Sequence, residues 1–374
     1  FGEQPPANSL VYPDKPQPAP VNLELVICCD CSLLQLRQHL NPKALFSDYV
    51  WVTGTSGVTK KYSKDFMKMV MKKCPCLDPL VIEIASNDGT FLKPFIRDGL
   101  EVLGVDPAAN IANKAVQDGI PTIIDFFSKQ LALEIKQNNP VKPKVVIARN
   151  VIPHTPEVHS IFEGIEHLIG ESGFGVIEFH DTGLLLRELQ YDYVYHEHVF
   201  YYTLNTMKQL IERYHLKVVD VFSSPISGGS HVVILTSSKS GMPVSERLGN
   251  ELRAEREQGL MSVDKWLDFG KKCKQHGDRT RNLIMGLHGN VVGYGASARS
   301  STLLNYCGLT CDHIRFIIDK NPLKHGKITA GSRIPVIDLV EGASSIEPED
   351  TILLMAWNFA DEIVKELRSF GIKN

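Results

Sequence analysis

The sequence lacks several features that would place it in a specialised class of protein. No apolar run approaches the ~20 residues that a membrane-spanning helix needs. Basic residues are not in excess, because 40 Lys and Arg stand against 43 Asp and Glu. The net charge of −3 therefore gives no reason to expect a nucleic-acid partner. No signal peptide is visible, although the first residue is Phe1 rather than Met.

Cysteine is also scarce and irregularly placed. Eight cysteines in 374 residues are too few for a disulfide framework, which favours a reducing compartment and predicts a cytoplasmic protein. Cys28 and Cys31 have the Cys-x-x-Cys spacing of half a zinc site, but no second pair with that spacing is present. The pair indicates either a zinc site whose other ligands lie upstream of this sequence or two ordinary thiols.

The composition is that of a globular protein, with 43% hydrophobic and 22% charged residues. A chain of this length is too long for one core. Strand–helix alternation over 61–240, and again over 288–374, predicts an α/β fold with two Rossmann-like domains. A charged helical pattern predicts a connector over 241–287, and residues 1–60 form a small N-terminal region.

The densest chemistry lies in one stretch, Tyr191-Asp192-Tyr193-Val194-Tyr195-His196-Glu197-His198. A histidine can exchange protons near neutral pH, and a neighbouring carboxylate can orient its ring. A nearby phenol can donate a hydrogen bond to an oxygen that becomes negative. These groups suit proton removal next to a carbonyl, but the same composition also fits a polar surface loop.

In the first α/β domain, polar residues occur at or just after the ends of successive strands. Glu83 closes the strand 80–84, and Asp106 follows the glycine turn by about 20 residues, where a ribose would offer hydroxyls. The turn lacks Gly-x-Gly-x-x-Gly, so a pyrophosphate cradle is poorly supported. Glu83 instead suits the amino group of S-adenosylmethionine, and Asp125 and Phe126 suit the edge and ring of adenine.

The second α/β domain opens on Gly293-x-Gly295, a strand–helix turn of the kind that binds phosphate. Arg299 could add a bidentate contact, and Asp319 ends the next strand. The backbone amides of Gly228 and Gly229 could also face a ligand. Each of these turns could equally bind nothing. Residues 45–60, with Tyr49 and Trp51, form either a ligand-contacting loop or a linker.

These motifs together resemble a known family. The chain resembles the three-part sugar C-methyltransferases, which act on nucleotide-linked deoxysugars. The matching motifs cover nearly the whole chain: Gln4-Pro5-Pro6-Ala7-Asn8, Cys28-x-x-Cys31, Glu83 to Gly89, Asp106-Pro107, Asp125-Phe126-Phe127, Asn150 with His154, Tyr195 to His198, Gly228-Gly229-Ser230, Gly293-Tyr294-Gly295-Ala296 and Ala356-Trp357-Asn358.

The resemblance implies an S-adenosylmethionine-binding central domain, a zinc-bearing N-terminal part with Cys28 and Cys31, and a nucleotide sugar held against the C-terminal domain. His198 would remove the C3 proton of a 4-keto sugar, while Tyr195 and Glu197 orient near the enolate, which would attack the sulfonium methyl. The implied cofactor residues are Glu83, Ala85, Asn87, Gly89, Asp106, Pro107, Asp125, Phe126 and Asn150. The implied substrate residues are Tyr49, His196, Gly228, Gly229, Gly293, Gly295 and Arg299.

The chain departs from the family pattern in four places. Ala85 replaces a glycine, Trp51 replaces a tyrosine, Val232 replaces an arginine, and His180-Asp181 replaces Pro-Tyr. These changes leave room for a different sugar or for O-methylation. A nicotinamide-dependent sugar oxidoreductase and a non-catalytic binding protein remain as alternatives, and we expect a monomer or homodimer.

Overall fold

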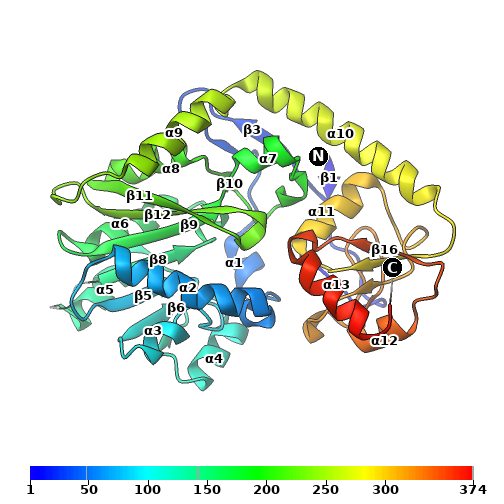
Figure 1. Ribbon diagram of the computed structural model, residues 1–374, viewed down its shortest axis with the longest axis horizontal. Coiled ribbons are helices and arrows are strands. Elements are labelled where there is room, and N and C mark those ends of the chain that lie inside the picture. The colour runs from blue at the N-terminus through cyan, green and yellow to red at the C-terminus, as the bar shows by residue number, and fades with distance from the viewer. Residues whose placement is uncertain (48, 141, 143, 373–374) are drawn as a thin grey trace.

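A seven-stranded sheet forms the centre of the larger domain in the computed structural model, which describes residues 1–47, 49–140, 142 and 144–372 (Figure 1). The strand order is β11-β12-β9-β8-β5-β6-β7. All neighbours are parallel except β12, which is antiparallel to both β9 and β11. The strands are β5 (Leu80–Ile84), β6 (Val102–Val105), β7 (Thr122–Ile123), β8 (Lys144–Arg149), β9 (Phe174–His180), β11 (Leu216–Ser224) and β12 (Ser230–Ser237).

Helices cover both faces of this sheet, as the continuous apolar strands require. Every residue of β5 is buried, so each of its faces needs a cover. One core lies under α5 (Lys129–Asn138), α6 (Val158–Ile169) and α8 (Leu204–Ile211). The other lies under α2 (Gly57–Lys73), α3 (Lys93–Arg97) and α4 (Ala109–Gln117). The α/β prediction for this domain is confirmed.

The C-terminal domain repeats the α/β plan on a smaller scale. Its four strands are parallel in the order β15-β14-β13-β16. They are β13 (Val291–Tyr294), β14 (Ile317–Ile318), β15 (Val336–Ile337) and β16 (Thr351–Leu354), with helices α11 (Ala298–Cys307), α12 (Leu339–Ser344) and α13 (Ala360–Ser369). In both sheets the strand order reverses, between β5 and β8 and between β13 and β16, and such points are where α/β sheets bind ligands.

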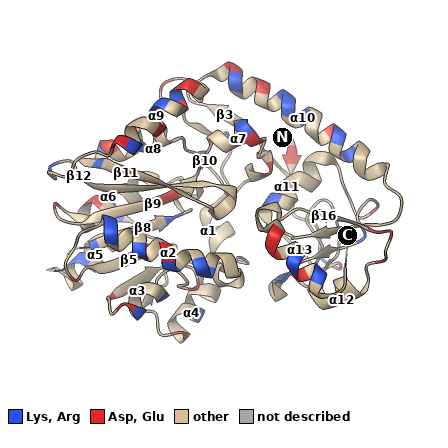
Figure 2. Ribbon diagram, in the orientation of Figure 1, with Lys and Arg blue, Asp and Glu red and all other residues tan. Residues whose placement is uncertain are grey.

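Two helices connect the domains. Helix α9 (Glu246–Gln258) packs on the central domain, and α10 (Val263–Met285) arches from it to the C-terminal domain (Figure 1). Figure 2 shows residues of both charge signs along α9, α10 and α13. Among the described residues, no helix combines the length and apolar character needed to cross a bilayer.

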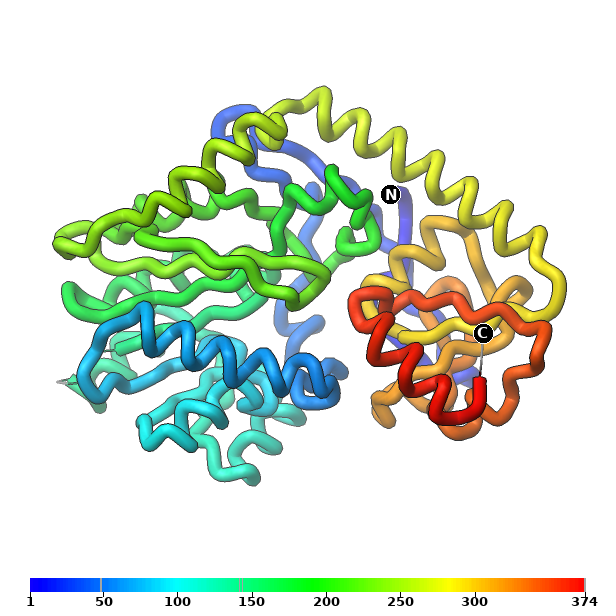
Figure 3. The backbone as a smooth tube through the Cα atoms, viewed as in Figure 1, coloured from blue at the N-terminus to red at the C-terminus, as the bar shows by residue number. Residues whose placement is uncertain are grey.

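The N-terminal residues run between the two domains (Figure 3). The proline- and asparagine-rich composition of residues 1–22 predicts irregular structure, but β1 (Glu3–Gln4) and β2 (Val21–Asn22) pair there. Farther along, β3 (Leu25–Ile27) and β4 (Leu34–Leu36) form a hairpin, and α1 (Pro42–Phe46) follows. A bridge between Val11 and Ile328 ties this segment to the C-terminal domain.

One predicted helix boundary is wrong. The sequence pattern over Tyr201 to Tyr214 predicts one helix, but Phe200–Tyr201 forms β10, which pairs with β4 from the N-terminal hairpin. Helix α8 begins only at Leu204, because the Thr203 side chain accepts a hydrogen bond from the Thr206 amide and closes a capping box. The pairing partner lies more than 160 residues away, so no local pattern could reveal it.

The turn after β5 depends on Gly89, which has φ +70°. A Cβ there would lie 2.1 Å from Cδ1 of buried Ile120. Gly99 has a similar φ of +83°, but no described atom lies within 4 Å of the position that its Cβ would take. The Gly99→Ala variant therefore measures the cost of the backbone strain alone. We expect Gly99→Ala to cost about 1 kcal/mol of unfolding free energy and Gly89→Ala about 1–3 kcal/mol more. Urea unfolding of both variants measures this difference; equal losses would show that Ile120 moves aside without cost.

Candidate active site

A cavity of about 430 Å³ opens between the central sheet, the N-terminal segment and the C-terminal domain. Its wall includes the carboxyl ends of β5, β6 and β8 and those of β13 and β16. The strand-order reversals of both domains therefore face one shared space.

The structure brings many of the predicted site residues to this cavity. Those that line it are Tyr49, Glu83, Ala85, Asn87, Asp106, Pro107, Phe126, Asn150, Tyr195, His198, Gly295 and Arg299. Those that lie outside its wall are Cys28, Cys31, Gly89, Asp125, His196, Glu197, Gly228, Gly229 and Gly293.

Glu83 is the buried acid of the cofactor half. Its Oε2 atom has no hydrogen-bond partner among the described residues, and its Oε1 atom lies 3.9 Å from the nearest guanidinium nitrogen of Arg149. Burial raises the pKa of Glu83 to about 8, against the opposing pull of Arg149. Asn150, which also lines the cavity, has a buried Oδ1 atom with no hydrogen-bond partner among the residues that the structure describes. Two acceptors without partners at one end of the cavity fit a ligand that carries an ammonium group.

The turn after β5 is held in shape by hydrogen bonds. Asp106 accepts hydrogen bonds from the backbone amides of Asn87 (2.8 Å) and Ala108 (2.9 Å). Burial raises the pKa of Asp106, although these amides oppose the shift. Each carboxylate oxygen keeps a further lone pair for a ligand hydroxyl. The side chain of Asn87 holds the loop at Trp51 and Thr53 through hydrogen bonds to their backbone groups.

Ala85, the residue that replaces the family's glycine, adopts φ +55°. The backbone therefore keeps the left-handed conformation that glycine favours, at some conformational cost to alanine. At the adenine end, Phe126 lines the cavity, whereas Asp125 is exposed and accepts a hydrogen bond from the Phe126 amide.

His198 is oriented by two neighbours in its own segment. Its Nδ1 atom lies 2.8 Å from the carbonyl oxygen of Tyr193, and its Nε2 atom lies 2.8 Å from the hydroxyl of Tyr195. A carbonyl only accepts, so Nδ1 carries the hydrogen and Nε2 is the basic nitrogen. Burial, helped by the neighbouring His154 ring, lowers the pKa of His198 well below its usual value. The ring is therefore neutral and ready to accept a proton.

His154 and Asn8 are cavity residues for which no individual role was predicted from the sequence. The His154 ring lies 4.7 Å from that of His198, centroid to centroid, and burial lowers its pKa to about 4. Asn8 donates from Nδ2 to Glu197 over 2.6 Å. Both belong to motifs that carry the family resemblance, and that resemblance is the sequence signal that could have identified them as site residues.

Glu197 acts behind the cavity wall. Its two oxygens accept hydrogen bonds from Asn8 and from the Tyr49 hydroxyl, at 2.6 and 2.8 Å. Burial raises the pKa of Glu197 to about 7, while these two donors oppose the shift. Glu197 thus orients two cavity residues from the N-terminal segment. His196 points elsewhere, and its Nε2 lies 3.0 Å from the carbonyl oxygen of Val21. The stretch is buried throughout, so the surface-loop alternative is wrong.

The turn after β13 in the C-terminal domain is filled by side chains of the same domain. Asp319 accepts from the Ala296 amide over 2.8 Å, and Lys324 donates to both Asp319 and the Ala296 carbonyl. Gly295 has φ +94°, and a Cβ there would lie 2.6 Å from that of Ala356, so glycine permits the close approach of β13 and β16. Arg299 pairs with Asp192.

Cys28 and Cys31 lie on the turn between β3 and β4. Hydrogen bonds from the backbone amides of Cys31 and Asp30 lower the pKa of the Cys28 thiol. Within the described part of the chain, no third Cys, His, Asp or Glu lies close enough to complete a ligand group with this pair. The described residues thus supply two thiols, which do not make a tetrahedral zinc site.

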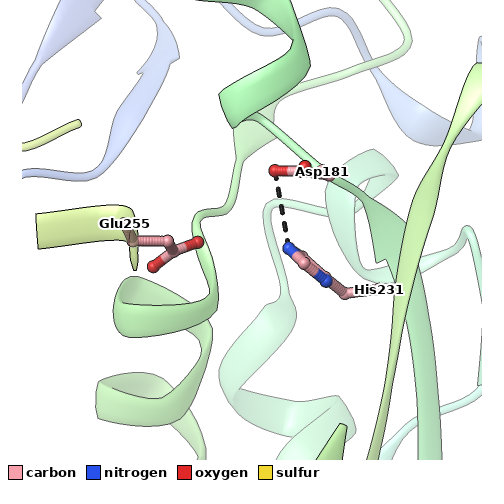
Figure 4. Close-up of side chains that lie close together, drawn as sticks. All are labelled: Asp181, His231 and Glu255. Atoms are coloured by element: carbon pink, nitrogen blue, oxygen red, sulfur yellow. Dashed lines mark ion pairs between the residues drawn. The ribbon is translucent and has the colours of Figure 1, made fainter. Parts of the chain in front are cut away.

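A separate cluster of Asp181, His231 and Glu255 lies outside the cavity (Figure 4). His231 Nε2 lies 3.4 Å from Asp181 Oδ1, and Asp181 also pairs with Arg187. Glu255 accepts from the first backbone amides of α8, at Leu204 and Asn205. With His231 protonated, two carboxylates face two cations and the charges balance. We therefore infer that His231 is protonated and that its imidazolium is the second cation of this cluster, beside Arg187.

The cluster generates a prediction about stability and pH. Burial acts to lower the pKa of His231, but Asp181 outweighs it and the net shift is upward. A raised folded-state pKa gives stability that is complete below pH ~6.5 and is lost as pH rises through the folded-state value. The difference in unfolding free energy between the wild type and His231→Gln should therefore shrink as pH rises above 6.5. The total loss should be about 1.4 kcal/mol for each pH unit by which the folded-state pKa exceeds the unfolded-state value.

Urea unfolding at several pH values measures this difference. Exposed His215→Gln is the matched control. A difference that stays constant or grows with pH would contradict the charged form of His231.

Comparisons with known proteins agree with the motifs. A family model described as a methyltransferase domain matches residues 67–221, and another, described as the C-methyltransferase C-terminal domain, matches residues 225–373. The chain is 32% identical over 352 residues to C-methyltransferase NovU of Streptomyces niveus, and the match covers 93% of this chain and 83% of NovU.

Two solved methyltransferase structures are similar to about half of this chain. Magnesium protoporphyrin IX methyltransferase from Synechocystis PCC 6803 with bound SAM is 12% identical, with a TM-score of 0.34, over 48% of this chain and 79% of that chain. A SAM-dependent methyltransferase from Anabaena variabilis is 14% identical, with a TM-score of 0.38, over 50% and 87%. Because 93% of the chain matches NovU and both domain models match, the chain belongs to the sugar C-methyltransferase family and is an S-adenosylmethionine-dependent C-methyltransferase.

Proposed function

We propose that this C-methyltransferase acts on a nucleotide-linked 4-keto deoxysugar and that His198 removes the proton at C3. The observation that carries the proposal is the neutral, buried imidazole of His198, which has its basic Nε2 atom beside the Tyr195 hydroxyl in the cavity wall. A 4-keto group makes the neighbouring C3 proton removable, because the resulting negative charge moves to the keto oxygen.

The cavity residues fit the cofactor. Glu83 and Asn150 carry the unpartnered acceptors that suit an ammonium group, while Asp106 and Phe126 suit a ribose and an adenine. When bound, S-adenosylmethionine supplies an electrophilic methyl group. The protein needs only to hold the two ligands together and to handle one proton.

His198 and Tyr195 divide the proton chemistry. Nε2 accepts the C3 proton, and the hydrogen bond from Nδ1 to the Tyr193 carbonyl stabilises the imidazolium that forms. The Tyr195 hydroxyl, freed from Nε2, can donate to the enolate oxygen. A positioned base is worth roughly 10²–10⁴-fold and an oxyanion donor roughly 10²–10³-fold in rate.

The cavity wall near the C-terminal domain supports a nucleotide sugar that lies toward that domain. There the wall includes Gly295, Ser297, Lys320 and Asn321, a set of small and polar residues. The oxidoreductase alternative has little support at this point. The Ala296 amide already donates to Asp319, and Lys324 neutralises that acid. Neither the amide nor the carboxylate is therefore presented to a dinucleotide.

Replacement of His198 tests the base. We expect His198→Asn to lower kcat by at least about 10²-fold, because Asn can keep a hydrogen bond but cannot accept the proton. Methyl transfer is followed by the gain of one methyl mass on a panel of 4-keto nucleotide sugars.

Exchange at C3 makes the test specific. In D₂O with S-adenosylhomocysteine, the wild type should exchange the C3 hydrogen of its substrate, while His198→Asn should not. His159→Asn, in α6 outside the cavity wall, is the matched histidine control. Exchange that survives in His198→Asn would refute the base assignment, and a wild type that binds the 4-keto sugars without exchange or transfer would refute the proposed substrate class.

Glu83 generates a prediction about cofactor affinity. Its pKa of about 8 means that the free protein holds Glu83 mostly protonated at pH 7, whereas an ammonium ligand needs the carboxylate. Binding of S-adenosylhomocysteine should therefore release a proton and tighten by up to about tenfold per pH unit between pH 6 and 8. Calorimetry in buffers of different ionisation enthalpy measures the proton. Glu83→Gln should bind S-adenosylhomocysteine more weakly, and its affinity should not change with pH. A pH dependence equal to that of the wild type would show that Glu83 does not bind the ammonium group.

A further inference from the structure

We propose that Arg299 and Thr302 of α11 are positioning residues that hold the His198 segment in its reactive arrangement. The C-terminal domain would thus build part of the catalytic centre instead of only receiving the substrate. This inference rests on the proposed role of His198 as the base, and it gives Arg299 a different task from the phosphate contact that the sequence suggested.

The ion pair between Arg299 and Asp192 is buried and two-pronged. Arg299 Nε lies 2.8 Å from Asp192 Oδ2, and Nη2 lies 2.9 Å from Oδ1. The exposed fractions of the two residues are 9% and 8%. Trp357 Nε1 adds a third donor to Asp192 at 3.0 Å, and its ring lies 4.6 Å from the guanidinium carbon. The edge of Arg299 formed by Nε and Nη2 is therefore bound to Asp192, and Nη1 donates to the Ser227 carbonyl over 2.9 Å, so both edges that could grip a phosphate are occupied.

A second contact from the same helix lies one turn away. The Thr302 hydroxyl donates to the Val194 carbonyl over 2.8 Å, and Thr302 is buried. At the start of α11, Ala298 packs against Tyr195. Figure 1 shows α11 at the side of the C-terminal domain that faces the central domain.

The two contacts bracket a single residue. Asp192 and Val194 are the chain neighbours of Tyr193, and the Tyr193 carbonyl is the group that receives the Nδ1 hydrogen of His198. Fixing the residues on either side fixes the direction of this carbonyl. The carbonyl in turn selects the tautomer that leaves Nε2 basic. Arg299 and Thr302 thus act on His198 through one peptide unit.

A purely structural pair would behave differently. Breaking a buried ion pair destabilises a protein whether or not catalysis depends on it. A substrate ligand would show itself in a raised KM for the nucleotide sugar, with kcat little changed. A positioning residue lowers kcat while substrate and cofactor affinities stay near their original values. It also changes the protonation pattern of the His198 ring.

Thr302 offers a matched pair of variants. Thr302→Val keeps the shape and removes the hydroxyl, whereas Thr302→Ser keeps the hydroxyl. We expect Thr302→Val and Arg299→Lys to lower kcat by about tenfold or more, with KM for the nucleotide sugar and Kd for S-adenosylhomocysteine within about twofold of wild type. Thr302→Ser should recover most of the lost rate.

Nitrogen NMR of ¹⁵N-histidine-labelled protein gives a readout that is independent of turnover. His198→Asn identifies the His198 signals. In wild type they should show one tautomer, with hydrogen on Nδ1; in Thr302→Val and Arg299→Lys they should show a mixture. An unchanged kcat with a single tautomer would overturn the inference, and so would a raised KM with kcat preserved in Arg299→Lys.

The same experiments separate this inference from the proposed function. If His198→Asn keeps its full rate while the tautomer mixes in Thr302→Val, the base assignment fails, and Arg299 and Thr302 set the tautomer of the His198 ring without a catalytic role. If His198→Asn is inactive but Thr302→Val keeps both its rate and its tautomer, the positioning role fails. Retained binding of S-adenosylhomocysteine shows that each variant is folded.

Discussion

The site depends on one hydrogen bond, from Nδ1 of His198 to the Tyr193 carbonyl. A backbone carbonyl can only accept, so it places the hydrogen of the neutral ring on Nδ1 and leaves Nε2 as the basic nitrogen, which is the atom that the proposed mechanism uses. The carbonyl direction is in turn controlled from outside the central domain, through Asp192 and Val194. The chemistry of the central domain thus relies on contacts from α11. This explains physically why the segment between α7 (Gly183–Glu188) and β10 is buried rather than exposed.

The two α/β domains share an acid at the end of the second strand but use it for different purposes. In each, the acid at the end of the second strand accepts an amide hydrogen from the first turn, Asp106 from Asn87 and Asp319 from Ala296. Asp106 is held by backbone amides and keeps lone pairs toward the cavity. Asp319 is neutralised by Lys324, which also holds the Ala296 carbonyl. The first turn is therefore open to a ligand with hydroxyl and ammonium groups, whereas the second is a closed structural corner that orients α11.

The strands could be read from the sequence because their information is local. β5 matches its predicted bounds of 80–84, since five apolar or buried positions end at a turn with polar residues. Cavity residues at strand ends, such as Glu83 and Asp106, follow from the same rule. The partners of the His198 segment do not, because Asn8, Asp192 and Thr302 meet their partners across 100 or more residues. The β10–β4 pairing could not be predicted for the same reason, and it is this pairing that makes the helix shorter than expected.

The low pKa of His198 raises a question about its strength as a base, because general bases work best when their pKa lies near the working pH. In the free protein, protonation would leave an isolated cation in a buried site beside His154, and this is why the pKa is low. During the proposed reaction, however, the proton arrives as negative charge develops on the substrate's keto oxygen. The imidazolium then forms next to an anion, and the two charges stabilise each other strongly where water is excluded. The same burial that keeps His198 unprotonated at rest would therefore favour its protonation only when an enolate forms, which ties proton transfer to the presence of the correct substrate.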